Sequence, residues 1–599
     1  MDRWIVVIGS LVHSTDTDLI QTFKNGLMVI DDSRRIVCVE ELSKPEDLTI
    51  DLLRSRLKKL WQIGSSKTIS RTKDLNDNII DNFNQNPFES EALCHSVNLI
   101  RLRTGEFFIP GFIDTHTHAV QYNNIGIGQQ YQLLDWLKNV TFSEEMRFES
   151  DRYAERTFER VVKRLISVGT TTACYYGSIH LKASKILAQV CHRAGQRAFI
   201  GKCNMDRNDA LEDYKENSAK ESIEDTIKLI NYVRQEFSSH QSKSSDRFVQ
   251  TSFGSMIVKR EDDCSVSEAS STIVQPILTP RFAISCSSEL LDGLGQLMRS
   301  DPTLRLQTHL SESRQEIMIT KELFKDHSSY GSIYDRFGLL TPTTILAHCI
   351  HLEPEELELI KLRGSGLSHC PTSNFNLSSG VCQVKEILDS GISKVGLGTD
   401  VSGGYGIGIL TSIRDGFIAS KALRFQDQQQ QQQQQQQNNI SRGEDRDGVE
   451  QQAFRETLTV ENLFYMASLG GSRVCGLEGL VGNFEVGKRF DGLLIQTGIN
   501  PQESDPSRST LEKIERENQE EEDDDDDDDD ERWFERYCSE RYEDGCNPNF
   551  FVEEEGGREL SLLELLEKFL FTGDDRNIGS VFIDSVVVGG ARPIKLKFS

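Results

Sequence analysis

Four short stretches of this 599-residue chain end in side chains that can bind a metal ion. They are His116-Thr117-His118 after FFIPGFID, His309 in LQTHLSES, His348 in ILAHCIHL and Asp400 in VGLGTD. The two histidines of an HxH pair share one face of an extended strand, and neutral imidazoles suit a borderline ion such as zinc. The pattern predicts one metal centre that acts as a Lewis acid in a hydrolytic reaction.

An HxH pair taken alone has a second interpretation, namely two hydrogen-bonded or surface histidines. The later His309 and Asp400 favour the metal, because each stands at the end of a predicted strand. His348 is either a direct ligand or a neighbour of the metal-bound water, and the sequence leaves both roles open. Of the nearby histidines, we assign His351 to a turn and His369 to a structural role or one beside the ligands.

Glu312 lies three residues after His309, close enough to share the same pocket. A carboxylate there can take a proton from an activated water and deliver it to a substrate nitrogen. The alternative is a glutamate at the first turn of the helix that ESRQEIMI begins, where the helix dipole stabilises it. The residues alone do not separate these roles.

Apolar runs alternate with longer amphipathic segments through the middle of the chain, as in repeated βα units. The predicted strands are FFIPGFID, TTTACYYG, RAFIGKCNM, VQPILTPRF, RLQTHLS, TILAHCI, GLSHCP and KVGLGTD. The predicted helices are 151–168, 184–194, 220–237, 289–298, 314–324 and 354–362. Eight parallel strands predict a (β/α)8 TIM-like barrel, in which side chains at the carboxyl ends of the strands form the active site.

Both ends of the chain have a different pattern, because WIVVIGS, GLMVIDDSRRIVCV, RFDGLLIQ and GSVFIDSVVVGG resemble strands without long helices between them. We expect a small β-sandwich domain formed from both termini, made of residues 1–104 and 476–599, beside a barrel over 105–475. The alternative is two unrelated β appendages.

Four biased segments interrupt these domains. They are a charged, Asn-rich stretch at about 43–97, a Ser-rich stretch at 241–272, the Gln tract within 426–451, and an acidic stretch within 500–556. Low apolar content cannot offset the entropy lost on ordering, so we expect the last three to be disordered. In the first segment, DLLRSRLKKLWQI has a helical pattern, and the sequence leaves open whether it is ordered.

The formal net charge of −27 is concentrated, because residues 512–531 alone hold 15 acidic and two basic side chains. We find no basic stripe or Arg-rich segment, so nothing electrostatic favours nucleic acid or an anionic membrane, and we expect a small-molecule partner. The 13 cysteines lack paired spacing, as in reduced cytosolic proteins. No stretch approaches the roughly 20 apolar residues of a membrane span, so we expect a cytosolic protein.

Longer stretches around these groups carry a specific resemblance. They are PGFIDTHTHAVQY, LLDWLKNVTFSEE, ILTPRFAISCS, QTHLSES, AHCIHL, SHCPTSNFNLSSG, GLGTDVSGG and NLFYMASLGGSRVCGLEGLVGNFEVGKRFDGLLI. Together they resemble the guanine deaminases, a family of the metal-dependent amidohydrolase superfamily. The resemblance runs from about Gly105 to Ile495 and returns in EKFLFTGDDRNIGSVFIDSVVVGG.

The resemblance implies one zinc ion per subunit, held by His116, His118, His309 and Asp400, with His348 beside the activated water. It implies guanine and water as substrates and a homodimer. The implied catalytic residues are Glu312, Asp400 and His348, and the implied substrate contacts are His118, Gln121, Arg281, Phe282, His309, Glu312 and Asp400. Arg281 is expected on the O6 side of the purine.

The implied reaction is attack of water on C2 of guanine while Glu312 protonates N3, followed by loss of ammonia to leave xanthine. Two other functions stay open. One is an aminohydrolase of the same superfamily that acts on another purine or a triazine. The other is a non-catalytic barrel scaffold, although such a scaffold would typically have lost metal ligands. The unrelated zinc deaminases are excluded, because their PCxxC pattern is missing from the sequence.

Overall fold

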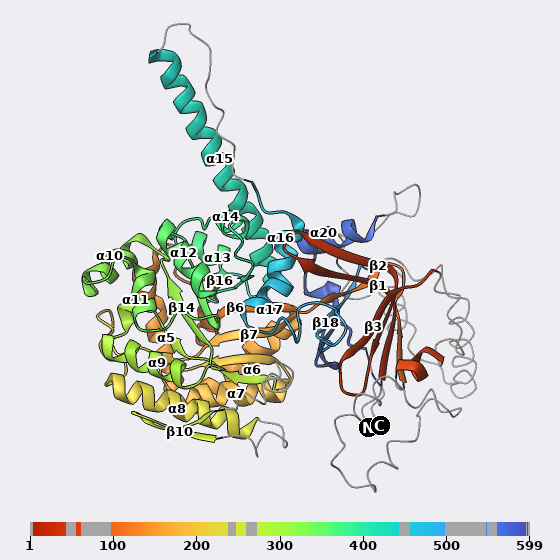
Figure 1. Cartoon of the computed structure of the whole chain (residues 1–599), viewed down its shortest axis with the longest axis horizontal. Helices are drawn as coiled ribbons and strands as arrows, with labels where there is room; N and C mark the ends of the chain where they lie inside the picture. Colours follow the sequence, from red (N-terminus) through yellow and green to blue (C-terminus); the bar gives the residue numbers. More distant parts are fainter. Residues whose placement is uncertain are drawn as a thin grey trace, which may run out of the picture.

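The structure is a computed structural model that describes residues 4–43, 55–60, 97–237, 247–258, 272–441, 456–497, 547, 560–594 and 596. Figure 1 shows a group of strands surrounded by helices beside a sheet of long strands, with both chain ends near that sheet. Across the described residues, none of the helices combines the length and the apolar composition needed to cross a membrane.

All eight predicted strand segments of the middle region contain parallel strands, and two of them are each split into two short strands. The first segment, FFIPGFID, was predicted as one strand but is divided, because FFIP lies in β5 (Glu106–Pro110), which belongs to the sheet of the two termini and pairs antiparallel with β18 (Gly492–Gln496) there. The strands are β6 (Phe112–His118), β7 (Thr170–Tyr176), β8 (Arg197–Gly201), β9 (Cys203–Asn204), β12 (Val274–Pro276), β13 (Thr279–Pro280), β14 (Leu306–Leu310), β15 (Thr344–His348), β16 (Gly366–His369) and β17 (Val395–Leu397). The paired orders are β6-β7-β8-β12, β9-β13 and β14-β15-β16-β17. Backbone contacts also link these groups of strands to one another. Leu278, just before β13, forms a bridge with Leu306 of β14, and the Asp400 amide, after β17, donates to the His116 carbonyl of β6 at 2.9 Å.

The helices between these strands follow the predicted apolar periodicity. The six predicted ones are α6 (Asp151–Ser167), α7 (Leu181–Ala194), α8 (Ala219–Glu236), α9 (Ser288–Ser300), α10 (Arg314–Leu323) and α12 (Pro354–Arg363). In α6, Ala154, Phe158 and Leu165 lie on the buried face, as expected for a helix that covers a sheet. Gly195 and Gly364 end α7 and α12 with φ of 70° and 68°, a left-handed conformation that glycine adopts without strain.

Shorter helices complete the described part of this region. They are α11 (Tyr330–Arg336), α13 (Pro371–Asn376), α14 (Val384–Asp389), α16 (Val460–Tyr465), η8 (Met466–Gly470), α17 (Gly471–Val474) and the short η7 (Ala283–Ser285).

A run of short helices between β6 and α6 was not predicted. It consists of η2 (Ala119–Asn124), α4 (Leu133–Trp136), η3 (Leu137–Thr141), α5 (Phe142–Met146) and η4 (Arg147–Glu149). Leu133, Trp136 and Phe142 from this run pack in one buried cluster with Phe282, which follows β13. The run thereby lies over the carboxyl ends of the strands, where the predicted site residues are.

Strands from both ends of the chain form one hydrogen-bonded sheet in the order β20-β19-β18-β5-β1-β2-β3, with β4 also paired to β1. They are β1 (Trp4–Asp16), β2 (Leu19–Ile30), β3 (Ile36–Glu41), β4 (Val97–Arg101), β5 (Glu106–Pro110), β18 (Gly492–Gln496), β19 (Ile578–Ile583) and β20 (Val586–Gly589). Alternate residues of β1 enter two different apolar clusters, one with Ile5 and Val7 and the other with Val6 and Ile8. The predicted joining of the two termini is confirmed, and the interpretation as unrelated appendages was wrong.

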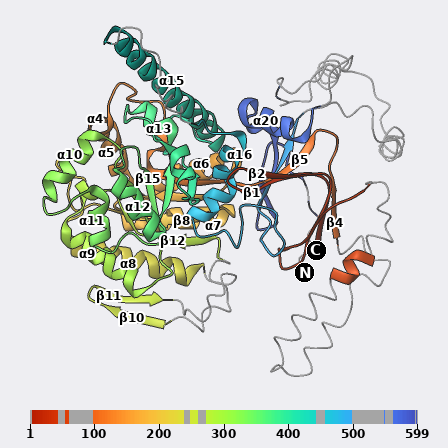
Figure 2. The ribbon, with the colours of Figure 1, turned by 45° about the horizontal axis from the view of Figure 1, so that its top comes forward.

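A buried ion pair ties this sheet to the strands of the middle region. Arg197, the first residue of β8, donates from Nε and Nη2 to the two carboxylate oxygens of Asp491 at 3.0 and 3.1 Å. Asp491 immediately precedes β18, and both side chains are almost fully buried. Phe569 of α20 (Leu562–Thr572) stacks on Phe112 of β6 with a centroid separation of 6.4 Å. Figure 2 shows α20 beside the sheet.

Two of the segments expected to be disordered contain regular structure. Residues 247–258, inside the Ser-rich stretch, form a hairpin of β10 (Arg247–Thr251) and β11 (Gly254–Val258). Met256 and Ile257 are buried, and Asn231 of α8 accepts the Ile257 amide at 2.8 Å. Burial of these two apolar residues and the hydrogen bond to Asn231 offset the entropy lost on ordering the segment. The overall composition of the segment did not indicate them.

The Gln tract continues a packed helix, α15 (Ile409–Ser441), which projects beyond the other helices in Figure 1. Ile409 and Ile413 in its first turns are buried, so the start of the helix is held by packing. Because glutamine is a good helix former, the helix continues from this packed start through the Gln tract. The expectation of disorder was therefore wrong for 426–441, whereas 442–451 lie outside the described residues. Residues 55–60 of the first biased segment are helical. Of the acidic segment only Asn547 is described, and its side chain donates to the Thr572 carbonyl at 3.0 Å.

Candidate active site

The five predicted metal-site residues converge at the carboxyl ends of the parallel strands. His116 and His118 lie at the end of β6, His309 on β14, His348 at the end of β15, and Asp400 three residues after β17. All five are buried. His348 and Asp400 have positive φ values of 69° and 45°, a strained conformation for residues other than glycine that often occurs at functional sites.

The distances between the ligand atoms fit a single small cation. His116 Nε2 and His118 Nε2 lie 3.2 and 3.3 Å from Asp400 Oδ1, and His118 Nε2 lies 3.3 Å from His309 Nε2. Ligand atoms around a tetrahedral zinc at 2.0–2.1 Å would be separated by about 3.3 Å. His348 is also close, because one ligand atom each of His116, His309, His348 and Asp400 lie within 4.8 Å of one another.

Hydrogen bonds at the far side of two rings decide which nitrogen faces the cluster. His309 Nδ1 lies 2.5 Å from the Arg281 carbonyl oxygen, and His348 Nδ1 lies 2.8 Å from Asn374 Oδ1. Both oxygens can only accept, so each Nδ1 carries the hydrogen and each Nε2 presents its lone pair to the cluster. His348 Nε2 is buried and has no hydrogen-bond partner among the described residues. A cation, or a water molecule bound to one, would satisfy it.

The protonation states suit a metal as well. Burial holds the pKa of His118 and that of His309 well below the ordinary value, so both rings are neutral. Burial acts to raise the pKa of Asp400, but its hydrogen bond with His116 and its electrostatic interactions with the surrounding imidazoles outweigh burial and hold that pKa well below its usual range. Neutral imidazoles with one carboxylate form a buried site of the type that binds divalent metal ions.

Glu312 lies beside this cluster and outside its ligand set. Its Oε2 is 3.5 Å from His348 Nε2, and its Oε1 accepts the Ser379 hydroxyl at 3.3 Å. Burial raises the pKa of Glu312 well above its usual range, and the negative charge of Asp400 adds to the effect. The helix-start alternative is not the observed one, because the N-cap of α10 is Ser313, whose capping box uses Glu316.

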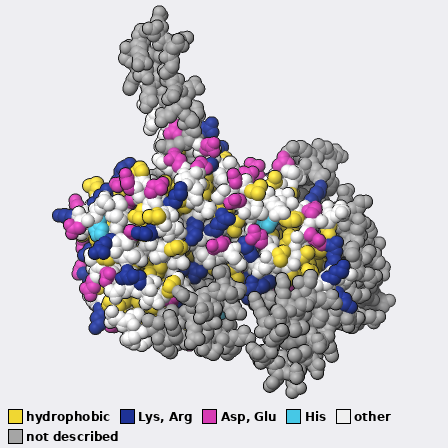
Figure 3. Space-filling view, viewed as in Figure 1, with side chains coloured by type: hydrophobic (Ala, Val, Ile, Leu, Met, Phe, Trp, Pro, Cys, Tyr) yellow, Lys and Arg dark blue, Asp and Glu magenta, His cyan; other side chains and the backbone are white. Residues whose placement is uncertain are grey.

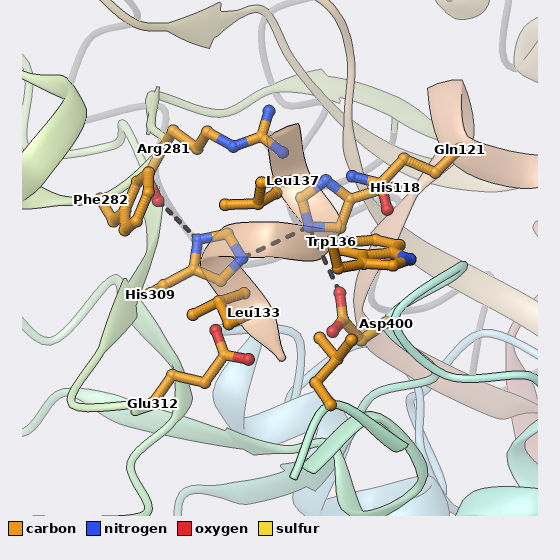
Figure 4. Close-up of a pocket in the computed structure, with 11 residues that line it drawn as sticks. His118, Gln121, Leu133, Trp136, Leu137, Arg281, Phe282, His309, Glu312 and Asp400 are labelled. Atoms are coloured by element: carbon orange, nitrogen blue, oxygen red, sulfur yellow. Dashed lines mark hydrogen bonds and ion pairs between the residues drawn. The ribbon is translucent and has the colours of Figure 1, made fainter. Parts of the chain in front are cut away.

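One pocket joins the metal cluster to the predicted purine contacts. It encloses about 330 Å³ and is lined by His118, Gln121, Leu133, Trp136, Leu137, Arg281, Phe282, His309, Glu312, Leu377 and Asp400. Figure 4 shows the polar groups pointing into it from opposite sides, with Glu312 below His309 and Arg281 above. The apolar wall of Leu133, Trp136 and Leu137 was missed as a set of site residues. The spacing of these residues within LLDWL was the available signal, since positions three and four apart share a helix face.

The two competing histidines lie outside the metal group. His351 is half-buried, and its Nε2 lies 2.8 Å from the Ser379 carbonyl oxygen. His369 is the last residue of β16, and burial lowers its pKa to about 3, so the ring is neutral. Both observations agree with the expected turn and structural roles.

A second hollow is lined by several arginines, although no basic stripe or Arg-rich segment was predicted from the sequence. It has a volume of about 870 Å³ and is lined by Arg147, Ser150, Arg152, Tyr153, Arg156, Thr157 and Arg160, mostly from α6. The four-residue spacing of three of these arginines was readable from the sequence and was overlooked. On the face shown in Figure 3, basic and acidic side chains are otherwise interspersed over the described surface.

A ring of parallel strands with a buried His/Asp metal cluster at its carboxyl ends defines a metal-dependent hydrolase of the amidohydrolase type. In agreement, the model of the amidohydrolase family matches residues 107–588, and the chain belongs to this family.

Within this family, the chain is similar to proteins named guanine deaminase. The chain is 35% identical to a guanine deaminase of Mus musculus over 501 residues, which covers 84% of this chain and 87% of the relative. It is 36% identical to a guanine deaminase of Dictyostelium discoideum over 487 residues, covering 81% and 87%. A crystal structure of guanine deaminase from C. acetobutylicum with bound guanine in the active site aligns with a TM-score of 0.63 and 28% identity, over 98% of this chain and 99% of that one.

Proposed function

We propose that this chain is a zinc-dependent guanine deaminase, which hydrolyses guanine to xanthine and ammonia. The observation that carries the proposal is the single pocket in which a His/Asp metal cluster, a buried carboxyl group and an arginine face one another. The similarity to proteins named guanine deaminase supports the choice of substrate.

Four residues would hold the zinc ion, namely His116, His118, His309 and Asp400. The separations near 3.3 Å that link His118 to His309 and to Asp400 favour His118 as a ligand. His348 Nε2 lies further from the aspartate, 3.7 Å from Asp400 Oδ2, and 3.5 Å from Glu312. We therefore assign His348 to orienting the water between the metal cluster and Glu312.

When bound, zinc would supply a nucleophile near neutral pH by lowering the pKa of a coordinated water toward about 7. Glu312 accepts the proton that this water loses and delivers it to N3 of the guanine ring as C2 is attacked. Glu312 would then take the proton of the new C2 hydroxyl group and deliver it to the C2 amino group, so that the C2–N bond breaks, ammonia leaves and xanthine remains. The raised pKa of Glu312 suits this exchange, because its carboxyl group can hold the proton between the two transfers.

Gln121, Arg281 and Phe282 would bind the purine on the side of the pocket away from Glu312. Arg281 offers only hydrogen-bond donors, which match the O6 oxygen of guanine. Adenine presents an amino group at that position and would leave buried donors unpaired, so the pocket should reject it strongly. Phe282 and Trp136 provide apolar surface for the ring faces.

The finer architecture and the biological setting belong to the same proposal. The parallel strands are taken as the (β/α)8 barrel of the superfamily, over about 105–475, and the sheet formed by both termini as its small β-sandwich domain. We further propose a homodimer with one zinc ion per subunit, acting in the cytosol.

The direct test is ammonia release from guanine by the purified full chain, measured before and after metal chelation and again after zinc is restored. We expect activity, its loss on chelation and its return with zinc. Guanine, adenine and 8-oxoguanine are assayed side by side. If the zinc-loaded protein released ammonia from another purine but not from guanine, the alternative aminohydrolase would replace this proposal. Absence of turnover with every base would favour a scaffold.

A further inference from the structure

Glu145 is a fully buried carboxylate that is adjacent to the pocket without lining it. It lies on α5 (Phe142–Met146), in the helical run over the strand ends, and its side chain has no exposed surface. Four donors from three other segments reach it. Arg281 Nη1 donates to Oε2 at 2.7 Å and Nη2 to Oε1 at 3.0 Å, Gln121 Nε2 donates to Oε1 at 2.8 Å, and the Tyr214 hydroxyl donates to Oε2 at 3.0 Å.

These four bonds saturate the carboxylate. A carboxylate has about four lone-pair positions, two on each oxygen, and here each oxygen accepts two donors. Glu145 has no free position with which to take a proton from water or substrate. Its role is therefore distinct from that of Glu312, which accepts a single hydrogen bond, from Ser379, among the described residues.

The arrangement fixes the orientation of Arg281. The paired bonds to Glu145 hold the end of the guanidinium, and the Phe142 ring of the same helix lies 5.1 Å from the Arg281 Cζ atom. A guanidinium has five N–H donors in a planar fork, and only two of them point to Glu145. The remaining donors lie in the plane that the carboxylate sets, and Arg281 lines the pocket, where a ligand could use them.

Glu145 also fixes the amide of Gln121. Because a carboxylate accepts but does not donate, the Gln121 nitrogen must face Glu145, and the amide oxygen then accepts the Ser402 amide at 3.1 Å. Both side chains that would contact the base thus receive their orientation from one carboxylate.

We propose that Glu145 is a positioning residue that sets the preference of the pocket for an oxo group on the purine, by holding Arg281 and Gln121 as donors. The inference rests on the proposed guanine deaminase activity. Among the described residues, the other buried ion pairs of an arginine, Arg197–Asp491 and Arg234–Asp301, and the buried pair Lys202–Glu216 involve no residue that lines the pocket. Neutralising the charge of a buried arginine is therefore common to several carboxylates of this chain, whereas orienting two pocket residues is particular to Glu145.

The test uses full-length variants with zinc bound. Glu145→Gln keeps the shape but loses the charge and two acceptor positions, and Glu145→Asp keeps the charge but is too short to make the same bonds. Tyr214→Phe removes one of the four bonds and leaves the carboxylate in place. Glu144→Gln is the matched control, because Glu144 is also buried on α5 but bonds Asn123, Tyr153 and Arg147 outside the pocket.

The readouts are kcat/KM for guanine, and inhibition constants for hypoxanthine, which carries the oxo group, and for unsubstituted purine, which lacks it. We expect Glu145→Gln and Glu145→Asp to lower kcat/KM for guanine by about 10²-fold, because the recognition groups are misplaced. The inhibition constant of hypoxanthine should rise by a similar factor. Purine binding should change by less than about threefold, since it does not use the oriented donors. Tyr214→Phe should shift the hypoxanthine constant in the same direction but less, and Glu144→Gln should not shift it.

Equal weakening of both ligands, or recovery of the wild-type ratio by Glu145→Asp, would assign Glu145 a purely structural role and overturn the inference. Zinc content and melting temperature are recorded for each variant, so that unfolding is recognised, and Tyr214→Phe decides the matter if both Glu145 variants unfold. If wild-type protein fails to deaminate guanine, the proposed function fails instead, independently of the ratio between the two inhibitors.

Discussion

The two sides of the pocket are built in different ways. On the metal side, His116, His309 and His348 stand at the ends of parallel strands, and their order in space follows from the order of the strands. On the purine side, Gln121 and Glu145 come from short helices inserted after β6, and Arg281 from the turn after β13. The strand ends are fixed by the backbone pairing of the whole ring, whereas the inserted helices are held by side chains.

This difference shows how each side of the pocket is held rigid; we call the two sides the metal half and the purine half. Metal ligands are placed by the strands, and His309 is in addition oriented by its contact with the Arg281 backbone carbonyl. The recognition groups depend on one saturated carboxylate, Glu145, whose removal would release several of them together. The metal half should therefore fail through loss of the ion, and the purine half through loss of selectivity.

The sharpest test of the metal half is His116→Ala. We expect zinc and activity to be lost together, down to the level of buffer alone, because a ligand to the ion has gone. Metal content by mass spectrometry and ammonia release are the measurements. His351→Ala is the matched control, since His351 lies outside the metal group. Stoichiometric zinc in the His116 variant would remove this residue from the ligand set.

Glu312→Gln separates proton transfer from metal binding. We expect kcat to fall by about 10² to 10⁴-fold with zinc retained, because the amide cannot carry the proton between water and substrate. Steady-state assays with a zinc determination test this expectation. Glu322→Gln, an exposed position on α10, should leave kcat unchanged. An unaltered rate in the Glu312 variant would mean that another group moves the proton.

Asp491→Asn tests the connection between the sheet of the two termini and the parallel strands without touching the pocket. Removing the charge leaves the buried Arg197 uncompensated, so we expect a loss of about 3 kcal/mol in the free energy of unfolding, with little change in the activity of the folded protein. Denaturant titration gives the value. Asp292→Asn breaks an exposed contact of 3.8 Å to Arg299 and should cost less than about 1 kcal/mol. Similar losses in both variants would contradict the structural importance of the buried pair.

The smallest effect is expected from trimming Gln428–Gln437. The described side chains in this tract lie outside the pocket, and Gln429, Gln430, Gln432 and Gln433 are exposed. The buried part of α15, including Ile409 and Ile413, stays intact in the trimmed chain. We expect kcat and KM to equal those of the full chain. A large fall in kcat would show that the projecting helix influences the pocket.

Much of the metal half was predictable because its signals are local. Each ligand follows a short apolar run, and an apolar run that ends in a histidine or aspartate is visible without knowledge of the fold. The eight strand segments and six helices followed from periodicity for the same reason. The hairpin at 247–258 and the helical Gln tract were missed, since composition gave no information on the contacts of Asn231 or on the anchored start of α15.

The sequence by itself determined the kinds of side chain available, the strand and helix periods, and the family resemblance that pointed to guanine. Only the tertiary structure decided that Glu145 accepts donors from Gln121, Tyr214 and Arg281, which are 24, 69 and 136 residues away along the chain. The physical reason is that hydrogen bonds of a saturated carboxylate depend on positions within a few tenths of an ångström, and such positions arise from the packing of separate segments. Spacing along one chain does not contain them.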